Sequence, residues 1–322
     1  IKKDDVWELA TPKNVASFNY QDSDTEGLFF LTNFEAANYR LVKVLFTGEI
    51  LEIIPEKALA LKSVSILEDF IITNSINTDM NSFIEFYSKD GELLNHKIPN
   101  NIQGTFSSFS MHKEKLRFSV SNFINPTRYI DLDLDTLDYT IVWQDKVSNF
   151  NPSDYKKTFT YYESKDGTMV PLTYFHRKDL VIDAETPIFL YGYGGYNISI
   201  RPSFSRKYVG WLELGGIVAI ANLRGGGELG KEWHNAGRLK EKQNVFDDFL
   251  YASKYLEASG IGNRKSTVIS GRSNGGLLVG TSLVQNPNYF GATLPAVGVL
   301  DMLRFTEFTE GWGWRGDYGS PL

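Results

Sequence analysis

The sequence predicts a protein of two parts, a β-rich first half followed by an α/β second half. Residues 1–147 contain short β-rich runs broken by polar turns and almost no helical periodicity. From residue 148 onward, strands alternate with helices, which is typical of a mostly parallel sheet covered by helices on both faces. A third observation is the G-x-S-x-G pattern at Gly271–Gly275, between a β-branched run and an apolar helical face.

The first half contains three loose repeats, each a strand, a polar turn and a longer strand. Phe30, Phe70 and Phe118 begin successive repeats, at spacings of 40 and 48 residues (70 − 30 and 118 − 70). This period suits four-stranded propeller blades, although three repeats are too few to close a propeller. A β-sandwich is the alternative. The expected strands are 28–32, 39–46, 69–73, 82–87, 116–120 and 127–133.

The second half begins after a loop at 149–153, whose Asn and Pro residues are typical of a turn. A helix is expected at 246–258, with Phe246, Phe249, Leu250 and Tyr255 as its apolar face and Gly260 closing it. The expected strands are 158–162, 170–175, 187–191, 216–220, 267–269 and 291–297.

The Gly271–Gly275 pattern predicts a serine on a strained turn between a strand and a helix, with its hydroxyl exposed above the sheet. Glycines are needed at both ends of the pattern because a Cβ atom there would clash inside so tight a turn. The backbone N–H of Asn274 is expected to point at the oxygen of an attacked carbonyl, where the helix N-terminus adds partial positive charge. The alternative is a glycine-rich turn with an incidental serine, which the flanking strand and helix disfavour.

Composition excludes several classes of function. Hydrophobic residues at 42% and charged residues at 22% are ordinary for a soluble globular protein, and the net charge of −6 argues against nucleic acid as a partner. The absence of cysteine excludes disulfides, thiol catalysis and cysteine metal sites. The longest apolar run, 216–221, is too short to span a bilayer, and no signal peptide is visible. We therefore expect a cytoplasmic protein with no membrane partner.

Two glycine clusters, Gly192–Tyr196 and Arg224–Glu228, invite interpretation as phosphate-binding loops. Neither completes a G-x-x-x-x-G-K-[ST] motif or a G-x-G-x-x-G motif before a helix. Both follow predicted strands of the second half, where loops near a nucleophile and the second oxyanion donor are expected.

The second half contains five motifs in the order Tyr191–Ser199, Ala221–Glu228, Gln243–Phe249, Gly271–Leu278 and Trp314–Gly319. Taken together and in this order, they resemble the prolyl oligopeptidase family of serine peptidases. The resemblance implies the N-terminal part of an α/β-hydrolase domain over residues 148–322, incomplete at its C-terminus. More weakly, it implies the last blades of a β-propeller over residues 1–147.

The resemblance also implies roles for individual residues. Ser273 corresponds to the nucleophile that forms the acyl-enzyme, Asn274 to the backbone donor of the oxyanion hole, and Tyr193 to the hydroxyl that serves as the second donor. Taken by itself, Tyr193 could equally be a packed strand end.

A proline pocket is implied by four further residues. Trp314 corresponds to the ring that stacks on the substrate proline, although it could by itself be a core aromatic. A flat apolar slot suits a pyrrolidine ring, which has no N–H to satisfy. The other walls correspond to Tyr196, where the family more often has phenylalanine, Val299 and Tyr318.

The base that should activate the serine is not found in the expected order, which is Ser, then Asp or Glu, then His. Asp301 and Asp317 follow Ser273, but no histidine does. We therefore expect this sequence to be a fragment with little peptidase activity by itself. The nearest substitute base is His234, which lies in the wrong order; the other histidines are His96, His112 and His176.

The expected function is that of a serine peptidase acting on short proline-containing peptides, which it cleaves on the carboxyl side of proline, without metal or cofactor. A first alternative is a relative of oligopeptidase B that cleaves after basic residues. Arg272 fits that alternative, whereas Asn274 and the Trp314 segment favour the prolyl branch. A non-catalytic propeller-containing binding protein is the second alternative, supported by the missing histidine. An esterase of the same fold is the third.

Overall fold

The computed structural model describes residues 2–3, 6–7, 9–13 and 15–321 of the chain. The chain divides into two compact units. The first comprises Ile1–Asn122 and Thr127–Asp145, and the second comprises Phe123–Pro126 and Lys146–Leu322.

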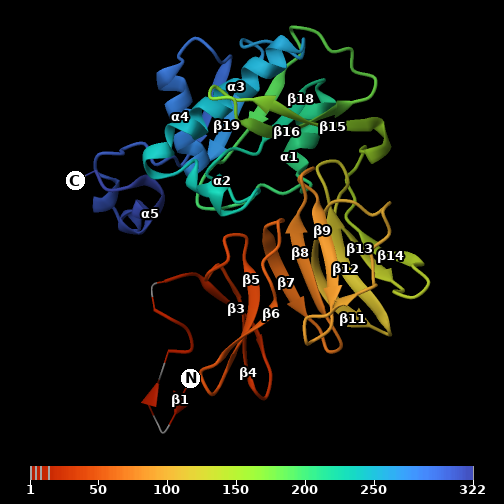
Figure 1. Cartoon of the computed structure of the whole chain (residues 1–322). Helices are drawn as coiled ribbons and strands as arrows, with labels where there is room; N and C mark the ends of the chain where they lie inside the picture. Colours follow the sequence, from red (N-terminus) through yellow and green to blue (C-terminus); the bar gives the residue numbers. More distant parts are fainter. Residues whose placement is uncertain (1, 4–5, 8, 14, 322) are drawn as a thin grey trace. The chain divides into compact units, whose positions relative to one another are not determined.

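The first unit contains three four-stranded antiparallel sheets that follow one another along the chain (Figure 1). In each sheet, strands consecutive in sequence are paired, so every sheet is a meander, as in a propeller blade. The blade prediction is therefore confirmed over the β-sandwich. The strands are β3 (Phe18–Ser23), β4 (Gly27–Thr32), β5 (Arg40–Leu45), β6 (Ile50–Ile54), β7 (Leu61–Ile66), β8 (Ile71–Ile76), β9 (Ser82–Tyr87), β10 (Leu93–Leu94), β11 (Thr105–His112), β12 (Lys115–Ser121), β13 (Arg128–Leu132) and β14 (Tyr139–Gln144), preceded by the pair β1 (Lys2–Lys3) and β2 (Val6–Trp7).

The repeated phenylalanines mark the second strand of each sheet. Phe30 lies in β4, Phe118 lies in β12, and Phe70 directly precedes β8; all three are buried. The sequence predicts the two middle strands of each sheet and misses the outer ones. Outer strands are more exposed, and all six residues of β14 are exposed, so an alternation of buried and exposed residues gives no signal there, although its Thr, Ile, Val and Trp residues are typical of a strand.

The second unit is built on a six-stranded sheet in the order β15-β16-β18-β17-β19-β20. Neighbouring strands from β18 to β20 are parallel, whereas β15 and β16 form an antiparallel pair at one edge, which agrees with the expected strands 158–162 and 170–175 joined by the turn Ser164–Gly167. The four strands from β18 to β20 are thus a parallel core, and the loops that follow their carboxyl ends lie at the same edge of the sheet. The strands are β15 (Tyr155–Glu163), β16 (Met169–Arg177), β17 (Ile188–Tyr191), β18 (Ile217–Ala221), β19 (Thr267–Arg272) and β20 (Ala292–Ala296).

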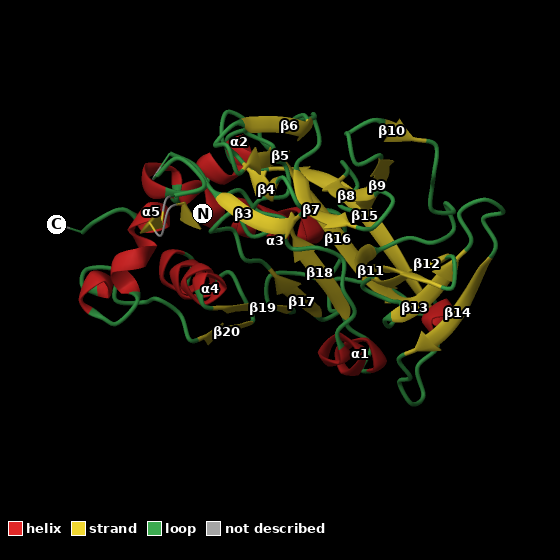
Figure 2. Cartoon of the chain, turned by 90° about the horizontal axis from the view of Figure 1, so that it is seen from below, coloured by secondary structure: helices red, strands yellow, loops and turns green. Residues whose placement is uncertain are grey.

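Helices cover both faces of this sheet (Figure 2). Ile217 and Ala219 belong to a core cluster with residues of α3 and α4, whereas Val218 and Ile220 pack with residues of α1. This alternation follows from the two-residue period of a strand that is buried on both faces. The helices are α1 (Arg206–Glu213), α2 (Lys231–Asn235), α3 (Gln243–Ala258), α4 (Asn274–Gln285) and α5 (Arg315–Tyr318), with 3₁₀ turns at Pro152–Asp154, Leu239–Glu241, Phe305–Glu307 and Gly311–Trp314.

Helix α3 begins three residues earlier than the sequence predicts, and its buried stripe is different. The predicted apolar face includes Phe246, Leu250 and Tyr255, but these are only half-buried. The helix ends as predicted, because Gly260 adopts a φ of 72° and its N–H bonds to the carbonyl of Glu257. The residues that α3 buries are Val245, Asp248, Phe249, Ala252, Ser253 and Leu256.

Within the part of the chain that the structure describes, no helix combines the length and the apolar character needed to cross a bilayer.

Candidate active site

Ser273 stands on a sharp turn between β19, which ends at Arg272, and α4, which begins at Asn274. Its φ of 57° and ψ of −120° lie outside the favoured regions for residues with a side chain. The turn is held on both sides, because the Ser273 N–H bonds to the carbonyl of Ala296 at 3.0 Å and its carbonyl accepts the N–H of Leu277 at 3.0 Å. The residue is exposed, so a strained backbone presents the Ser273 hydroxyl at the surface of the unit.

The glycines on either side make this turn possible. A Cβ atom on Gly271 would lie 2.1 Å from the carbonyl oxygen of Gly275, a distance that no side chain tolerates. On Gly275, a Cβ atom would lie 3.1 Å from the carbonyl oxygen of Gly192, which is tight but less severe. The steric requirement is therefore stronger at Gly271.

Tyr193 brings its hydroxyl to Ser273 from the loop that follows β17. A hydrogen bond joins the two side chains. Burial and the nearby charge of Asp317 raise the pKa of Tyr193, and the bond to Ser273 offsets this only in part. The phenol therefore keeps its proton at neutral pH, as a hydrogen-bond donor to a developing oxyanion must.

The two glycine clusters pack against each other and fix the Tyr193 loop. A Cβ atom on Gly225 would lie 2.7 Å from the carbonyl oxygen of Gly194, so only glycine permits this approach. Asn197 donates its N–H to the Gly225 carbonyl at 3.2 Å. The loop is tied further along by Glu228, whose buried carboxylate accepts the N–H of Ile200 at 2.8 Å.

The side chain of Asn274 supports the neighbouring loops. It is 1% exposed, and its Nδ2 donates to the carbonyl oxygen of Tyr193 at 2.5 Å. Its Oδ1 accepts two hydrogen bonds, from Lys242 Nζ at 3.1 Å and from the Tyr318 hydroxyl at 3.0 Å. This residue therefore has two separable parts, a backbone N–H at the helix start and a side chain that links three segments.

A buried carboxylate beneath the turn belongs to Asp317, a position to which the sequence assigns no role. Its Oδ1 accepts from the backbone N–H of Tyr196 and from His234 Nε2, both at 3.0 Å, and its Oδ2 accepts from Lys242 Nζ at 3.1 Å. Burial raises the pKa of Asp317, but the His234 hydrogen bond and the Lys242 charge outweigh it and hold the pKa below its usual value. Among the described residues we find no hydrogen bond between His234 and Ser273, and the Nε2 of His234 is used by Asp317, so the structure gives no support to His234 as a substitute base.

Two of the predicted pocket residues lie together. The rings of Tyr196 and Tyr318 pack edge to face, with centroids 5.5 Å apart, and Phe305 packs against the other side of Tyr318 at 5.6 Å. Trp314 and Val299 are half-buried. Within the described part of the chain, we find no hydrogen bond or ring contact that joins Trp314 or Val299 to the other predicted site residues.

A buried ion pair lies at the start of the glycine cluster Arg224–Glu228. The Arg224 guanidinium donates to Asp248 at 2.6 Å and to Asp166, and the side chains of Arg224 and Asp248 are 5% and 0% exposed. Ser164 also donates to Asp248, at 2.5 Å. The sequence contains both residues inside matched motifs, but nothing in it pairs Arg224 with Asp248.

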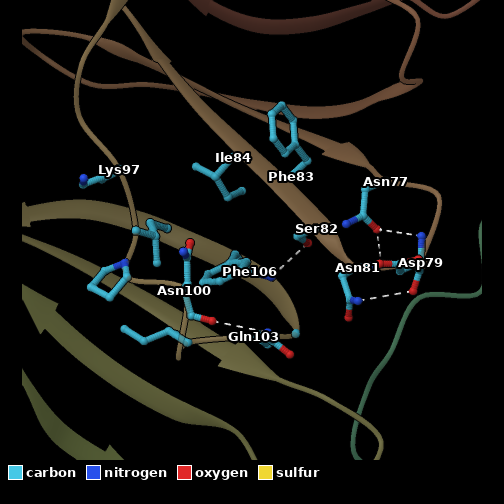
Figure 3. Close-up of a pocket in the computed structure, with 14 residues that line it drawn as sticks. Asn77, Asp79, Asn81, Ser82, Phe83, Ile84, Lys97, Asn100, Gln103 and Phe106 are labelled. Atoms are coloured by element: carbon cyan, nitrogen blue, oxygen red, sulfur yellow. Dashed lines mark hydrogen bonds between the residues drawn. The ribbon is translucent and has the colours of Figure 1, made fainter. Parts of the chain in front are cut away.

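Of two cavities, one borders a predicted site residue and the other does not. One, of about 670 Å³, borders Tyr318, Arg238 and Leu239 in the second unit. The other, of about 400 Å³, lies in the first unit and is lined by amide side chains and Phe83 (Figure 3). It contains none of the predicted site residues. Among the described residues, no cluster of three or more His, Cys, Asp or Glu could hold a metal ion.

Two family models match this chain. The model of the prolyl oligopeptidase N-terminal β-propeller domain matches residues 2–145, and the model of the prolyl oligopeptidase family matches residues 202–321. One model thus falls in each unit, and residues 146–201 of the second unit are matched by neither.

Individual relatives agree with these models. The chain is 38% identical over 312 residues to a prolyl endopeptidase of Elizabethkingia meningoseptica. The matched region covers 95% of this chain and 44% of the relative. It is 36% identical over 323 residues to a prolyl endopeptidase of Dictyostelium discoideum, covering 94% and 42%. It is 33% identical over 331 residues to a dual function macrocyclase-peptidase of Galerina marginata, covering 100% and 45%. The chain thus spans less than half the length of these relatives.

Solved structures show the same relationship. Prolyl oligopeptidase B from Galerina marginata, bound to a 35mer hydrolysis and macrocyclization substrate, superposes with a TM-score of 0.90 at 32% identity. The match covers 98% of this chain and 46% of that one. A prolyl endopeptidase structure from a study of inter-domain dynamics gives a TM-score of 0.89 at 34% identity, covering 99% and 47%.

Proposed function

This chain belongs to the prolyl oligopeptidase family of serine peptidases, and from that premise we propose that the protein cleaves short peptides on the carboxyl side of proline through an acyl-enzyme. The observation that carries the proposal is the strained turn at Ser273, whose exposed hydroxyl lies beside the Tyr193 hydroxyl and the start of α4. No metal or cofactor enters this proposal.

In the proposed reaction, Ser273 Oγ attacks the carbonyl carbon of the proline residue, and the Oγ–C bond forms as the carbonyl becomes an oxyanion. The Asn274 N–H and the Tyr193 hydroxyl stabilise that oxyanion. The C–N bond then breaks and the amine leaves with the proton that the Ser273 hydroxyl gave up. Water next hydrolyses the ester, releasing the carboxylic acid and returning a proton to Ser273. We do not place the general base on His234, because no hydrogen bond joins it to Ser273 among the described residues and its Nε2 faces Asp317 instead.

Two acids of the predicted pocket segment are already paired, so neither offers a site for a basic residue. A site for arginine or lysine needs an unpaired carboxylate to receive the cation. Asp317, the buried acid of the pocket segment, is already compensated by Lys242 and His234. Asp301 is paired with Arg304 at 2.6 Å. The rings of Tyr196 and Tyr318 instead offer an apolar wall.

A peptide series that differs only at the residue before the cleaved bond tests this specificity. We expect the full-length product of the gene to cleave the proline peptide and to leave the alanine and arginine peptides largely intact, as read by the masses of the fragments. Faster cleavage after arginine would contradict the proposal and favour the oligopeptidase B-like alternative.

A fluorophosphonate probe separates an enzyme from a non-catalytic binding protein. Such probes react with an activated serine, so we expect one label per chain, on the peptide that contains Ser273. The intact mass of the full-length product before and after treatment gives the readout. An unlabelled protein would favour the non-catalytic alternative.

Replacement of Tyr193 with phenylalanine tests the oxyanion donor. We expect kcat to fall by roughly 10²- to 10³-fold, because one preorganised donor is lost, while KM changes little because the ring remains. Steady-state kinetics on the proline peptide measures both. The control is Tyr191→Phe, two residues earlier at the end of β17. An equal loss in both variants would mean that the Tyr193 hydroxyl has no special role.

A further inference from the structure

We infer that Lys242 is a positioning residue for the reaction at Ser273, an inference that rests on the proposed function. Its Nζ donates three hydrogen bonds, to the Gly194 carbonyl at 2.9 Å, to Asn274 Oδ1 at 3.1 Å and to Asp317 Oδ2 at 3.1 Å. An ammonium has three donors, so the described contacts use all of them. The side chain is 12% exposed and therefore mostly enclosed by the groups that it joins.

The three acceptors belong to three segments that are far apart in the sequence. Gly194 follows Tyr193, the proposed hydroxyl donor, in the loop after β17. Asn274 follows the proposed nucleophile at the start of α4. Asp317 precedes Tyr318, a proposed pocket wall, in α5. One buried cation thus connects the oxyanion loop, the nucleophile turn and the pocket segment.

Two of the acceptors in turn hold residues of the proposed oxyanion hole and pocket. Asn274 uses its Nδ2 to hold the Tyr193 carbonyl, and its Oδ1 also accepts the Tyr318 hydroxyl. Asp317 uses its second oxygen to hold the backbone N–H of Tyr196. Lysine in this place therefore fixes three tyrosines without being placed in contact with the substrate.

Lysine suits this role because its ammonium is compact and its donors diverge in three directions. A planar guanidinium directs its donors within one plane and is larger, so it cannot reproduce the three bonds. The charge matters as well, because the ammonium compensates the buried Asp317 carboxylate and lies 5.3 Å from the centroid of the Tyr318 ring. Lys242→Arg keeps that charge and changes only the geometry, which makes it the informative variant.

We expect Lys242→Arg in the full-length gene product to lower kcat on the proline peptide by about 100-fold, the order of effect that a misplacement near 1 Å produces. KM should rise by a smaller factor than kcat falls, because Tyr196 and Tyr318 of the proposed pocket are held through the same groups, and the midpoint of thermal unfolding should change little. The rate of fluorophosphonate labelling at Ser273 should fall with kcat, because that reaction uses the same oxyanion donors. The control is Lys231→Arg, an exposed lysine in α2, which should change none of these rates.

A double-mutant cycle with Tyr193→Phe distinguishes positioning from a general structural effect. If Lys242 acts through the Tyr193 hydroxyl, Lys242→Arg should cost much less in the Tyr193→Phe background than in the wild type. Full additivity of the two losses would overturn the inference. The inference would also be overturned if Lys242→Arg lowered the midpoint of thermal unfolding but left kcat per labelled site unchanged.

The outcomes also separate this inference from the proposed function. A wild-type protein that takes the probe but prefers arginine peptides would contradict the proposed specificity, and the labelling rates of Lys242→Arg would still decide the inference. A wild-type protein without any label would overturn both. If Lys242→Arg does not fold, Lys242→Met combined with Asp317→Asn removes both charges together, and unchanged labelling in that variant would overturn the inference.

Discussion

Replacing Ser273 with alanine should lower kcat of the full-length protein by roughly 10⁴- to 10⁶-fold, the loss seen when a serine nucleophile is removed. Alanine leaves the Tyr193 hydroxyl, the Asn274 N–H and the pocket tyrosines in place, so peptide binding should survive. Steady-state kinetics and a binding assay with an uncleaved proline peptide measure the two effects. Residual turnover within about tenfold of wild type would mean that Ser273 is not the nucleophile.

The same position should also show that the active site stores strain. Ser273 has a φ of 57° and a ψ of −120°, which only glycine adopts readily. Ser273→Gly should therefore be more stable than Ser273→Ala, by about 1 kcal/mol after the entropy cost of glycine is subtracted. Neither variant should turn over substrate.

A control on the neighbouring helix should give the opposite order. Val284 lies in α4 and is 79% exposed. There, glycine should be less stable than alanine by about 1 kcal/mol, because the helix favours alanine. Urea unfolding of the four variants gives the comparison. If Ser273→Gly is also the less stable of its pair, the turn is not strained.

Much of the fold is predictable from local patterns. The middle strand β12 alternates between apolar and polar residues, and the β4, β17 and β18 segments are apolar nearly throughout, so their residues indicate their burial. The outer strands could not be found in this way. The residues of β14 are all exposed, and such a strand is defined by the backbone bonds that its neighbour β13 offers.

The candidate site also contains one part with a local sequence signal and one part without it. The turn at Ser273 is local, since its glycines and flanking elements lie within a few residues, and the sequence predicts it. Lys242 and Asp317 are 75 residues apart, and neither gives a local signal of the other. A charged residue ahead of a helix normally indicates a solvated surface, and only the fold shows that this lysine is enclosed.

Replacing Asp248 with alanine should lower the free energy of unfolding by about 3–5 kcal/mol, the cost of leaving a buried charge without its partner. The Asp248 side chain is 0% exposed, and Arg224, at 5% exposed, would keep its charge and lose the acceptor that is buried with it. Asp166 would still pair with Arg224, but it is 46% exposed, so it compensates the buried charge of Arg224 less than Asp248 does. Chemical unfolding of the full-length protein measures the loss.

The neighbouring residue provides the matched control. Asp247 pairs with Lys165 at 3.2 Å, and that lysine is 61% exposed, so Asp247→Ala should cost no more than about 1 kcal/mol. If burial of an unpaired charge is the cause, Arg224→Met combined with Asp248→Leu should recover most of the stability lost in Asp248→Ala. A double variant as unstable as Asp248→Ala would instead show that the hydrogen bonds themselves hold the glycine loop. In that case turnover should fall with stability, because the same loop packs against Gly194, next to the Tyr193 hydroxyl.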